Sequence, residues 1–167
     1  AKVVAKMSDQ VFYDSVHKFG YGSRPGSGFP GESGGVLPRP ARWSGSSKTT
    51  MSYGYGLSVT PLQIATAYSA LGNGGKLIPP TFVKGQHNEA RQVVDPQVAK
   101  EVVAMMETVV TLGGAKQAAV LGYHVAGKTG TARKAGPGGY ERGHYNALFA
   151  GVVPATNPRF ATVIVIN

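Results

Sequence analysis

The residues best suited to chemistry lie in one short run, Gly127-Lys128-Thr129-Gly130-Thr131. The surrounding pattern predicts a strand, and side chains alternate between the two faces of a strand. We therefore expect Lys128 and Gly130 on one face. Thr129 and Thr131 should share the other. A ligand can approach the backbone closely at a glycine, and an extended peptide can pair with the main chain of an edge strand. This run could therefore hold a carboxylate or help to move protons.

A nucleophile to accompany this run is not obvious. A Lys-Thr-Gly string also occurs by chance, and Lys128 would then be a solvated strand lysine. The only serine with a lysine three residues later is Ser15, in Ser15-Val16-His17-Lys18. A helix-surface lysine with ordinary solvation keeps its proton at neutral pH, so Lys18 would be a poor base. No serine is followed two positions later by asparagine.

Three strands are predicted around and after the run, because apolar and β-branched residues replace the helical spacing there. They cover residues 123–132, 147–153 and 160–166. Glycine and proline between residues 136 and 143 predict a turn, and residues 154–159 form a short connection. Short links favour antiparallel neighbours. The sequence therefore predicts an antiparallel sheet that carries Lys128.

Three helices are expected to flank this sheet. The first covers residues 3–19, and a glycine-rich loop to about residue 47 follows it. The second begins with the capping box Thr60-Pro61-Leu62-Gln63 and ends at Asn73-Gly74-Gly75. The third begins at Asp95-Pro96 and ends at Gly113-Gly114. Helical spacing selects the residues expected to face the core: Leu62, Ala65, Tyr68, Ser69 and Gly72 in the second helix, and Val98, Val102, Met105 and Val109 in the third.

Composition narrows the class of protein. The 167 residues are 42% hydrophobic, which suits one α+β domain or a large piece of one. The net charge of +9 favours an anionic partner or surface, unless the rest of a longer protein offsets it. Basic residues are scattered without interleaved aromatics, which argues against nucleic acid. The four histidines lack metal-ligand spacing and no nucleotide motif is present, so no metal or cofactor is expected.

Three segments together resemble class B penicillin-binding proteins, and the likeness covers nearly the whole chain. Val125-Ala126-Gly127-Lys128-Thr129-Gly130-Thr131-Ala132-Arg133-Lys134 resembles their Lys-Thr-Gly strand. Ser52-Tyr53-Gly54-Tyr55-Gly56-Leu57-Ser58-Val59-Thr60-Pro61-Leu62-Gln63 resembles a core segment, and Phe149-Ala150-Gly151-Val152-Val153-Pro154 resembles the following strand. Among these proteins, the septal, division-specific D,D-transpeptidases of Gram-negative bacteria are the most similar.

The resemblance implies the fold that penicillin-binding proteins share with serine β-lactamases, an antiparallel sheet with flanking helices. It implies that residues 1–167 are the C-terminal portion of a single transpeptidase domain. The nucleophile of Ser-x-x-Lys, and Ser-x-Asn, would lie upstream, and Ser15 is then a chance match. Such enzymes cross-link peptidoglycan by acyl transfer from D-Ala-D-Ala stem peptides through a serine acyl-enzyme. β-Lactams acylate the same serine.

The resemblance also assigns roles. Lys128 would supply positive charge in the catalytic site, and Thr129 and Thr131 would bind the carboxylate of the substrate or antibiotic around Gly130. The main-chain N–H of Thr131 would donate to the oxyanion. Arg133 is a candidate second carboxylate contact, with a solvated strand end as the alternative.

Tyr55, with Tyr53, is a candidate residue of the cleft, with a place in the core as the alternative. The expected partners are stem peptides, β-lactams, the upstream part of the same protein and septal division proteins. The expected location is the periplasmic side of the bacterial inner membrane, anchored by an N-terminal segment. Two other functions stay open: a serine β-lactamase, and a non-catalytic transpeptidase-like binding module.

Overall fold

The computed structural model describes residues 1–167. Its N-terminal part forms two helices, α1 (Lys2–Ala5) and α2 (Asp9–Lys18), where the sequence predicted one. The chain is extended at Ser8, whose hydroxyl oxygen accepts the N–H of Val11 at 3.2 Å and caps α2. This N-cap starts a new helix, and apolar spacing alone could not reveal the break.

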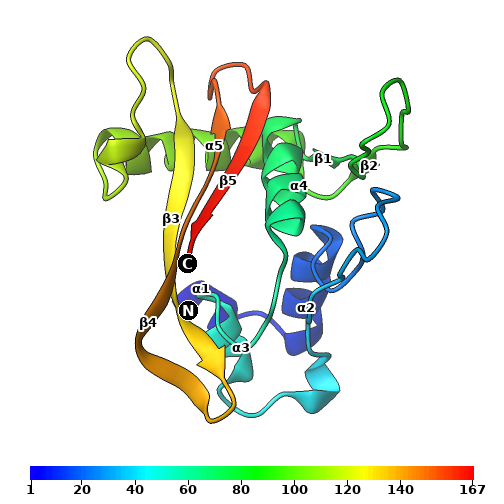
Figure 1. The fold of residues 1–167 in the computed structure, drawn as a ribbon, viewed down its shortest axis with the longest axis vertical. Coiled ribbons are helices and arrows are strands. Elements are labelled where there is room, and N and C mark those ends of the chain that lie inside the picture. Colours follow the sequence, from blue (N-terminus) through cyan, green and yellow to red (C-terminus); the bar gives the residue numbers. More distant parts are fainter.

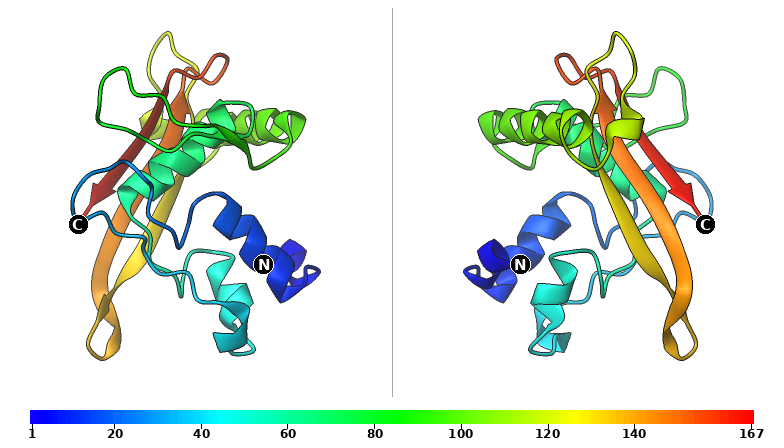
Figure 2. Two further views of the ribbon diagram at one scale, coloured as in Figure 1. Left: turned by 90° about the vertical axis from the view of Figure 1, so that its right-hand side faces the viewer. Right: turned by 90° about the vertical axis from the view of Figure 1, so that its left-hand side faces the viewer.

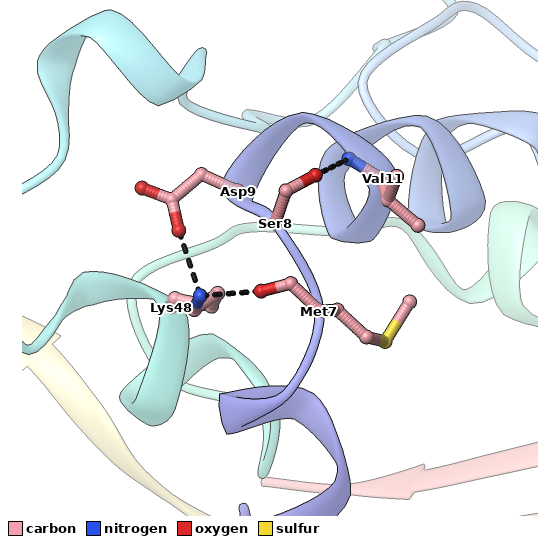
Figure 3. Close-up of polar contacts among 5 residues, drawn as sticks. All are labelled: Met7, Ser8, Asp9, Val11 and Lys48. Atoms are coloured by element: carbon pink, nitrogen blue, oxygen red, sulfur yellow. Dashed lines mark hydrogen bonds and ion pairs between the residues drawn. The ribbon is translucent and has the colours of Figure 1, made fainter.

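Lys48 fixes the turn between these two helices. Its ammonium group lies 2.8 Å from a carboxylate oxygen of Asp9 and donates at 2.8 Å to the carbonyl of Met7 (Figure 3). Lys48 belongs to α3 (Ser47–Met51), which follows the glycine-rich segment and the short 3-10 helix η1 (Pro40–Arg42). The contact therefore joins α3 to the start of the chain.

The two longer helices confirm the predicted ends and part of the predicted faces, since Tyr68, Val102 and Val109 pack against the apolar core. Helix α4 (Pro61–Gly72) has the complete capping box, and α5 (Pro96–Thr111) is capped by Asp95. The buried positions lie one residue later than most of those predicted: Gln63, Thr66, Ala67 and Ala70 in α4, and Ala99, Val103, Met106 and Val110 in α5. Val98 and Met105 are exposed instead. Spacing determines the width of an apolar stripe, whereas tertiary packing determines which of several adjacent apolar residues is buried.

The predicted antiparallel sheet is confirmed, with the strand order β3–β4–β5. Strands β3 (Ala126–Gly136) and β4 (Gly139–Val153) are longer than expected, and β5 (Phe160–Ile166) matches the prediction. The predicted turn at 136–143 is therefore wrong in extent, since only Pro137 and Gly138 separate the two strands. A glycine-rich sequence can remain in a hairpin ladder when main-chain pairing compensates for its low β-propensity.

The helices lie on one face of this sheet, with α4 and α5 against one end and α1 to α3 beside the other (Figures 1 and 2). Two small apolar clusters join α5 to the sheet. Their buried members are Val103, Met106, Ala126 and Val152 in one, and Val110, Ala115 and Val125 in the other. The start of β3, directly before the Lys-Thr-Gly run, is thus held in the core.

A short antiparallel ribbon and a 3-10 helix complete the structure. The ribbon consists of β1 (Lys76–Leu77) and β2 (Arg91–Gln92) and follows α4. The 3-10 helix η2 (Lys116–Ala118) follows α5. None of the helices is long and apolar enough to span a bilayer.

Candidate active site

The Lys-Thr-Gly run lies on a strand with one open edge. β3 pairs with β4 only, and β4 separates it from β5. The pairing is unbroken from Ala126 opposite Val152 to Arg133 opposite Tyr145, and the register shifts only beyond Arg133. The expected alternation of faces therefore holds through the whole run, with Arg133 on the face of Thr129 and Thr131.

Every second residue of β3 directs its main-chain N–H and C=O away from β4, toward the open edge. The N–H of Arg133 donates at 3.4 Å to the hydroxyl oxygen of Tyr55, outside the sheet. The ammonium group of Lys128 donates at 2.8 Å to the carbonyl of Thr129. Because main-chain groups alternate between the two sides of a strand, the N–H of Thr131 points to the same open edge as that of Arg133. An added peptide strand could pair there.

The two glycines of the run meet different surroundings. A Cβ built at Gly127 would lie 2.7 Å from Phe149 Cε2 and 2.8 Å from the carbonyl of Ala150, so a side chain at this position would clash within the chain. A Cβ at Gly130 would only touch Leu148 at 3.4 Å. Packing inside this chain thus requires the glycine at 127. The space at Gly130 is left for whatever approaches the strand.

A cavity of about 710 Å³ opens between β3, β4 and the helices. Sixteen of its 24 lining residues are hydrophobic. Gly130, Thr131 and Arg133 line it from β3, and Arg133 is its only charged side chain. Lys128 is exposed and lies outside this lining. The open edge therefore borders an apolar recess large enough for a small-molecule ligand.

A tyrosine cluster stands where the cavity meets the β3–β4 hairpin. Tyr55 packs edge-to-face on Tyr140 with ring centroids 5.0 Å apart, and Tyr53 packs on Tyr55 at 6.0 Å. The hydroxyl of Tyr140 accepts the N–H of Gly56 at 3.3 Å. Tyr53 and Tyr55, for which the sequence left the cleft and the core as alternatives, both line the cavity. Tyr140 is not among the residues predicted for the cleft, because its glycine-rich surroundings predict a turn.

The opposite wall of the cavity contains two phenols with perturbed acidity. Burial raises the pKa of Tyr21 to about 12, with a further contribution from Tyr68. Burial also raises the pKa of Tyr68. Both side chains line the cavity. Their phenols are neutral throughout the physiological range, so they add no charge to the recess.

Ser15 is not arranged as a nucleophile. Its hydroxyl donates at 2.7 Å to the carbonyl of Val11, one turn back in α2. Ser15 and Lys18 are both exposed, and neither lines the cavity. A hydroxyl that donates to its own helix backbone has no base to take its proton. No group of three His, Cys, Asp or Glu side chains could hold a metal ion.

Comparisons with known proteins agree with this geometry. The family model described as penicillin-binding protein transpeptidase domain matches residues 1–167. The chain is 40% identical to a probable peptidoglycan D,D-transpeptidase, PbpC, of Pseudomonas aeruginosa, and 41% identical to the peptidoglycan D,D-transpeptidase FtsI of Escherichia coli K12. Each match covers the whole chain and 30% or 29% of the relative's length.

Solved structures show the same fold. The transpeptidase domain of penicillin-binding protein 3 from Burkholderia pseudomallei superposes with a TM-score of 0.90 at 38% identity, over 99% of this chain and 51% of that one. Penicillin-binding protein 3 of Mycobacterium tuberculosis, solved with aztreonam, gives 0.89 at 36% identity, over 96% of this chain and 40% of that one. The matched part of this domain includes the cavity and the open edge of β3, and the chain belongs to the penicillin-binding protein transpeptidase domain family.

Proposed function

We propose that this chain supplies the Lys-Thr-Gly half of an acyl-transfer site in a septal peptidoglycan D,D-transpeptidase. It would be the C-terminal portion of a single transpeptidase domain, on the periplasmic side of the inner membrane. The observation that carries the proposal is the open edge of β3 beside the cavity. The N–H of Thr131 and the exposed Lys128 both belong to this edge.

The reaction begins with a serine supplied by the upstream part of the domain. It attacks the penultimate D-Ala carbonyl of a stem peptide, and an oxyanion forms on the carbonyl oxygen. The N–H of Thr131 stabilises this oxyanion, together with a donor from the serine's own segment. The terminal D-Ala then leaves as an amine, and an amine of a neighbouring stem accepts the acyl group.

The side chains of the run recognise the end of the stem peptide. The hydroxyls of Thr129 and Thr131 donate to the terminal carboxylate, and Lys128 supplies a positive field at the reacting centre. Hydrogen bonds to a charged group contribute about 1.5–3 kcal/mol each. Arg133, the only charged residue lining the cavity, gives a second cationic contact for the carboxylate.

β-Lactams are the second class of ligand that this site would take. Two of the similar Mycobacterium tuberculosis structures are complexes with aztreonam and ampicillin. A β-lactam carries an acyl group and a carboxylate in the same relation as D-Ala-D-Ala, so the same edge would hold it. A β-lactamase would in addition need a water and a base for deacylation, so turnover of the antibiotic, rather than stable acylation, would favour that function.

The test is the rate of penicillin acylation in a domain that also contains the upstream segment. Lys128→Ala should lower this rate at least about a hundredfold, the effect of losing one positioned electrostatic or proton-transfer group. Because Lys128 is exposed, the variant should keep its thermal stability. Lys100→Ala, an exposed lysine of α5, is the matched control and should react normally. Near-normal acylation of a folded Lys128→Ala variant would refute the proposal.

A further inference from the structure

Two loops on the far side of α4 from β3 carry an exposed aromatic pair that the proposed acyl transfer does not use. Phe29 and Phe82 pack edge-to-face with ring centroids 5.7 Å apart, yet they are 65% and 69% exposed. The side chain of Asn88 donates to the carbonyls of Pro79 and Pro80 and so holds the second loop in shape. Large apolar surface that stays in water next to defined loops is typical of an interaction site.

The same two loops meet at a small recess that contains two arginines, since Arg24 and Pro25 line it from one loop and Pro79 lines it from the other. The ribbon β1–β2 places Arg91 opposite Leu77, and both residues line a recess of about 160 Å³ together with Arg24. Neither arginine has a carboxylate oxygen within 4.0 Å, since the three ion pairs of the structure involve other residues. The recess is below the size of a site for a drug-sized ligand, and a single side chain or carboxylate would fill it.

The nearest internal anion is already engaged. Glu32 accepts the N–H groups of Gly26 at 3.0 Å and of Ser27 at 2.8 Å. Hydrogen bonding from Ser27, the largest cause, lowers its pKa, and Arg24 contributes to the same shift. Glu32 thus shapes the loop and offsets part of the charge of Arg24. The guanidinium of Arg91 has no such partner.

We propose that Arg24, Phe29, Phe82 and Arg91 form a docking surface for an acidic and apolar segment of a partner protein. A carboxylate of the segment enters the recess between the two arginines, whose planar guanidinium groups suit bidentate pairing with carboxylates. An adjacent apolar side chain covers the Phe29–Phe82 pair. The surface joins two arginines that form no ion pair within 4.0 Å to exposed aromatic area, and this combination selects the chemistry of the occupant.

The shape favours a protein segment over an anionic membrane. The two arginines line a recess that one side chain can enter, whereas recognition of an anionic membrane draws on larger clusters of basic residues. The docking surface is also separate from the open edge of β3, with α4 between them (Figure 1). A bound partner would therefore leave the acyl-transfer site free.

A display library of random 12-residue peptides tests this surface without assuming a sequence. The domain that also contains the upstream segment is used as bait, and peptides that also bind its variant Arg24→Gln/Arg91→Gln are removed. If the arginines bind peptides in the 167-residue chain but not in this longer domain, the rest of the domain covers them and the proposal is overturned. We expect the remaining binders to be enriched in Asp or Glu next to an aromatic residue or leucine. Synthetic copies should lose at least tenfold in affinity with Arg91→Gln or with Phe82→Ser, measured by fluorescence anisotropy.

Matched controls separate this surface from general charge and hydrophobicity. Arg142→Gln and Leu121→Ser change an exposed arginine and an exposed apolar residue elsewhere and should leave peptide affinity unchanged. Replacing Glu by Gln in the peptide should cost as much as Arg91→Gln. No acidic enrichment, or binders that are insensitive to both surface variants, would overturn the proposal. It would also be overturned if vesicles of phosphatidylglycerol and phosphatidylcholine bind the chain and lose binding with these variants while peptides do not.

Discussion

The open edge of β3 and the buried amide of Gln63 use main-chain polar groups in opposite ways. On β3, the N–H of Thr131 points out of the sheet, toward the space that a ligand would occupy. The side chain of Gln63, which is 1% exposed, instead satisfies main-chain groups from within the chain. Its side-chain nitrogen donates to the carbonyls of Gly20, Ser23 and Gly34 at 3.2, 2.9 and 2.8 Å.

This difference distinguishes main-chain groups that can bind a ligand from main-chain groups that hold the fold together. Unpaired main-chain groups stay unpaired without cost only where water or a ligand can reach them. A long glycine-rich loop needs an internal partner instead, and Gln63 provides it from the first turn of α4. Gly35 shows how close the fit is, since a Cβ there would clash with the carbonyl of Ser58 and lie 2.9 Å from Gln63 Oε1, at a φ of +62°. We therefore expect changes at Gln63 to act on stability and changes on β3 to act on chemistry.

Gln63→Leu should have the largest effect. It keeps the approximate volume but leaves three carbonyls and the N–H of Thr60 without a partner. At about 1–3 kcal/mol for each buried unsatisfied group, partly relieved by relaxation, we expect a loss of about 3–5 kcal/mol of unfolding free energy. Urea unfolding measures it. Gln97→Leu, on the exposed side of α5, should stay within about 0.5 kcal/mol. A loss of unfolding free energy in Gln63→Leu as small as that in Gln97→Leu would contradict the supporting role of Gln63.

Thr131→Val should act on recognition without acting on stability. The change removes an exposed hydroxyl and keeps the shape of the side chain. Acylation by β-lactams with a free carboxylate should fall about tenfold or more, the effect of one charge-assisted hydrogen bond. Carboxylate-free analogues should change little, and Thr156→Val should be neutral for both. Equal losses for the two ligand classes would instead indicate local misfolding.

Tyr55→Phe should have a smaller effect on the acylation rate. It tests whether Tyr55 only borders the open edge or takes part in the reaction. It removes the hydroxyl that accepts the N–H of Arg133 at 3.4 Å but keeps the ring on Tyr140. A neutral hydrogen bond contributes about 0.5–1.5 kcal/mol, and this one is long, so we expect a two- to fivefold loss of acylation rate. A loss as large as that of Lys128→Ala would mean that Tyr55 touches the reacting groups directly.

Tyr21→Phe should be the mildest change and visible only in alkali. The unfolded chain loses the phenol proton near pH 10, whereas the folded chain keeps it until about pH 12. The native state therefore loses stability as pH rises through this window, by up to about 2 kcal/mol. Tyr21→Phe should weaken this loss in urea titrations at pH 9 and pH 11, and Tyr123→Phe should not. An unchanged slope would show that folding does not raise the pKa of Tyr21.

The sequence predicted the sheet and the capped ends of α4 and α5 because these depend on local residues. Thr60 with Gln63, Asp95, and the alternation around Lys128 each act within a few positions. Val102 packs against the core as predicted, but Val98 and Met105 are exposed. Local spacing does not distinguish these two from Ala99 and Met106, which tertiary packing buries. The break before α2 depended on one serine cap.

The candidate site was predicted from the Lys-Thr-Gly motif alone. Residues that reach the site, or support it, from distant parts of the sequence were therefore not predicted. Tyr140 lies 85 residues beyond Tyr55 in the sequence, and only the hairpin brings their rings together. The requirement for glycine at 127 arises from Phe149 on the neighbouring strand, which no local pattern reveals. The buried role of Gln63 was hidden behind its place in the capping box, where it needs only one partner.

The central claim is that β3 offers half of an acyl-transfer site and that the nucleophile comes from elsewhere in the domain. Intact-mass spectrometry after treatment with penicillin tests it most directly. The 167-residue chain alone should gain no covalent adduct, since the hydroxyl of Ser15 donates a hydrogen bond to the carbonyl of Val11 and has no base to activate it. The chain joined to its upstream segment should gain one adduct, on the upstream serine. A stoichiometric adduct on the chain alone, mapped to Ser15, would contradict the account.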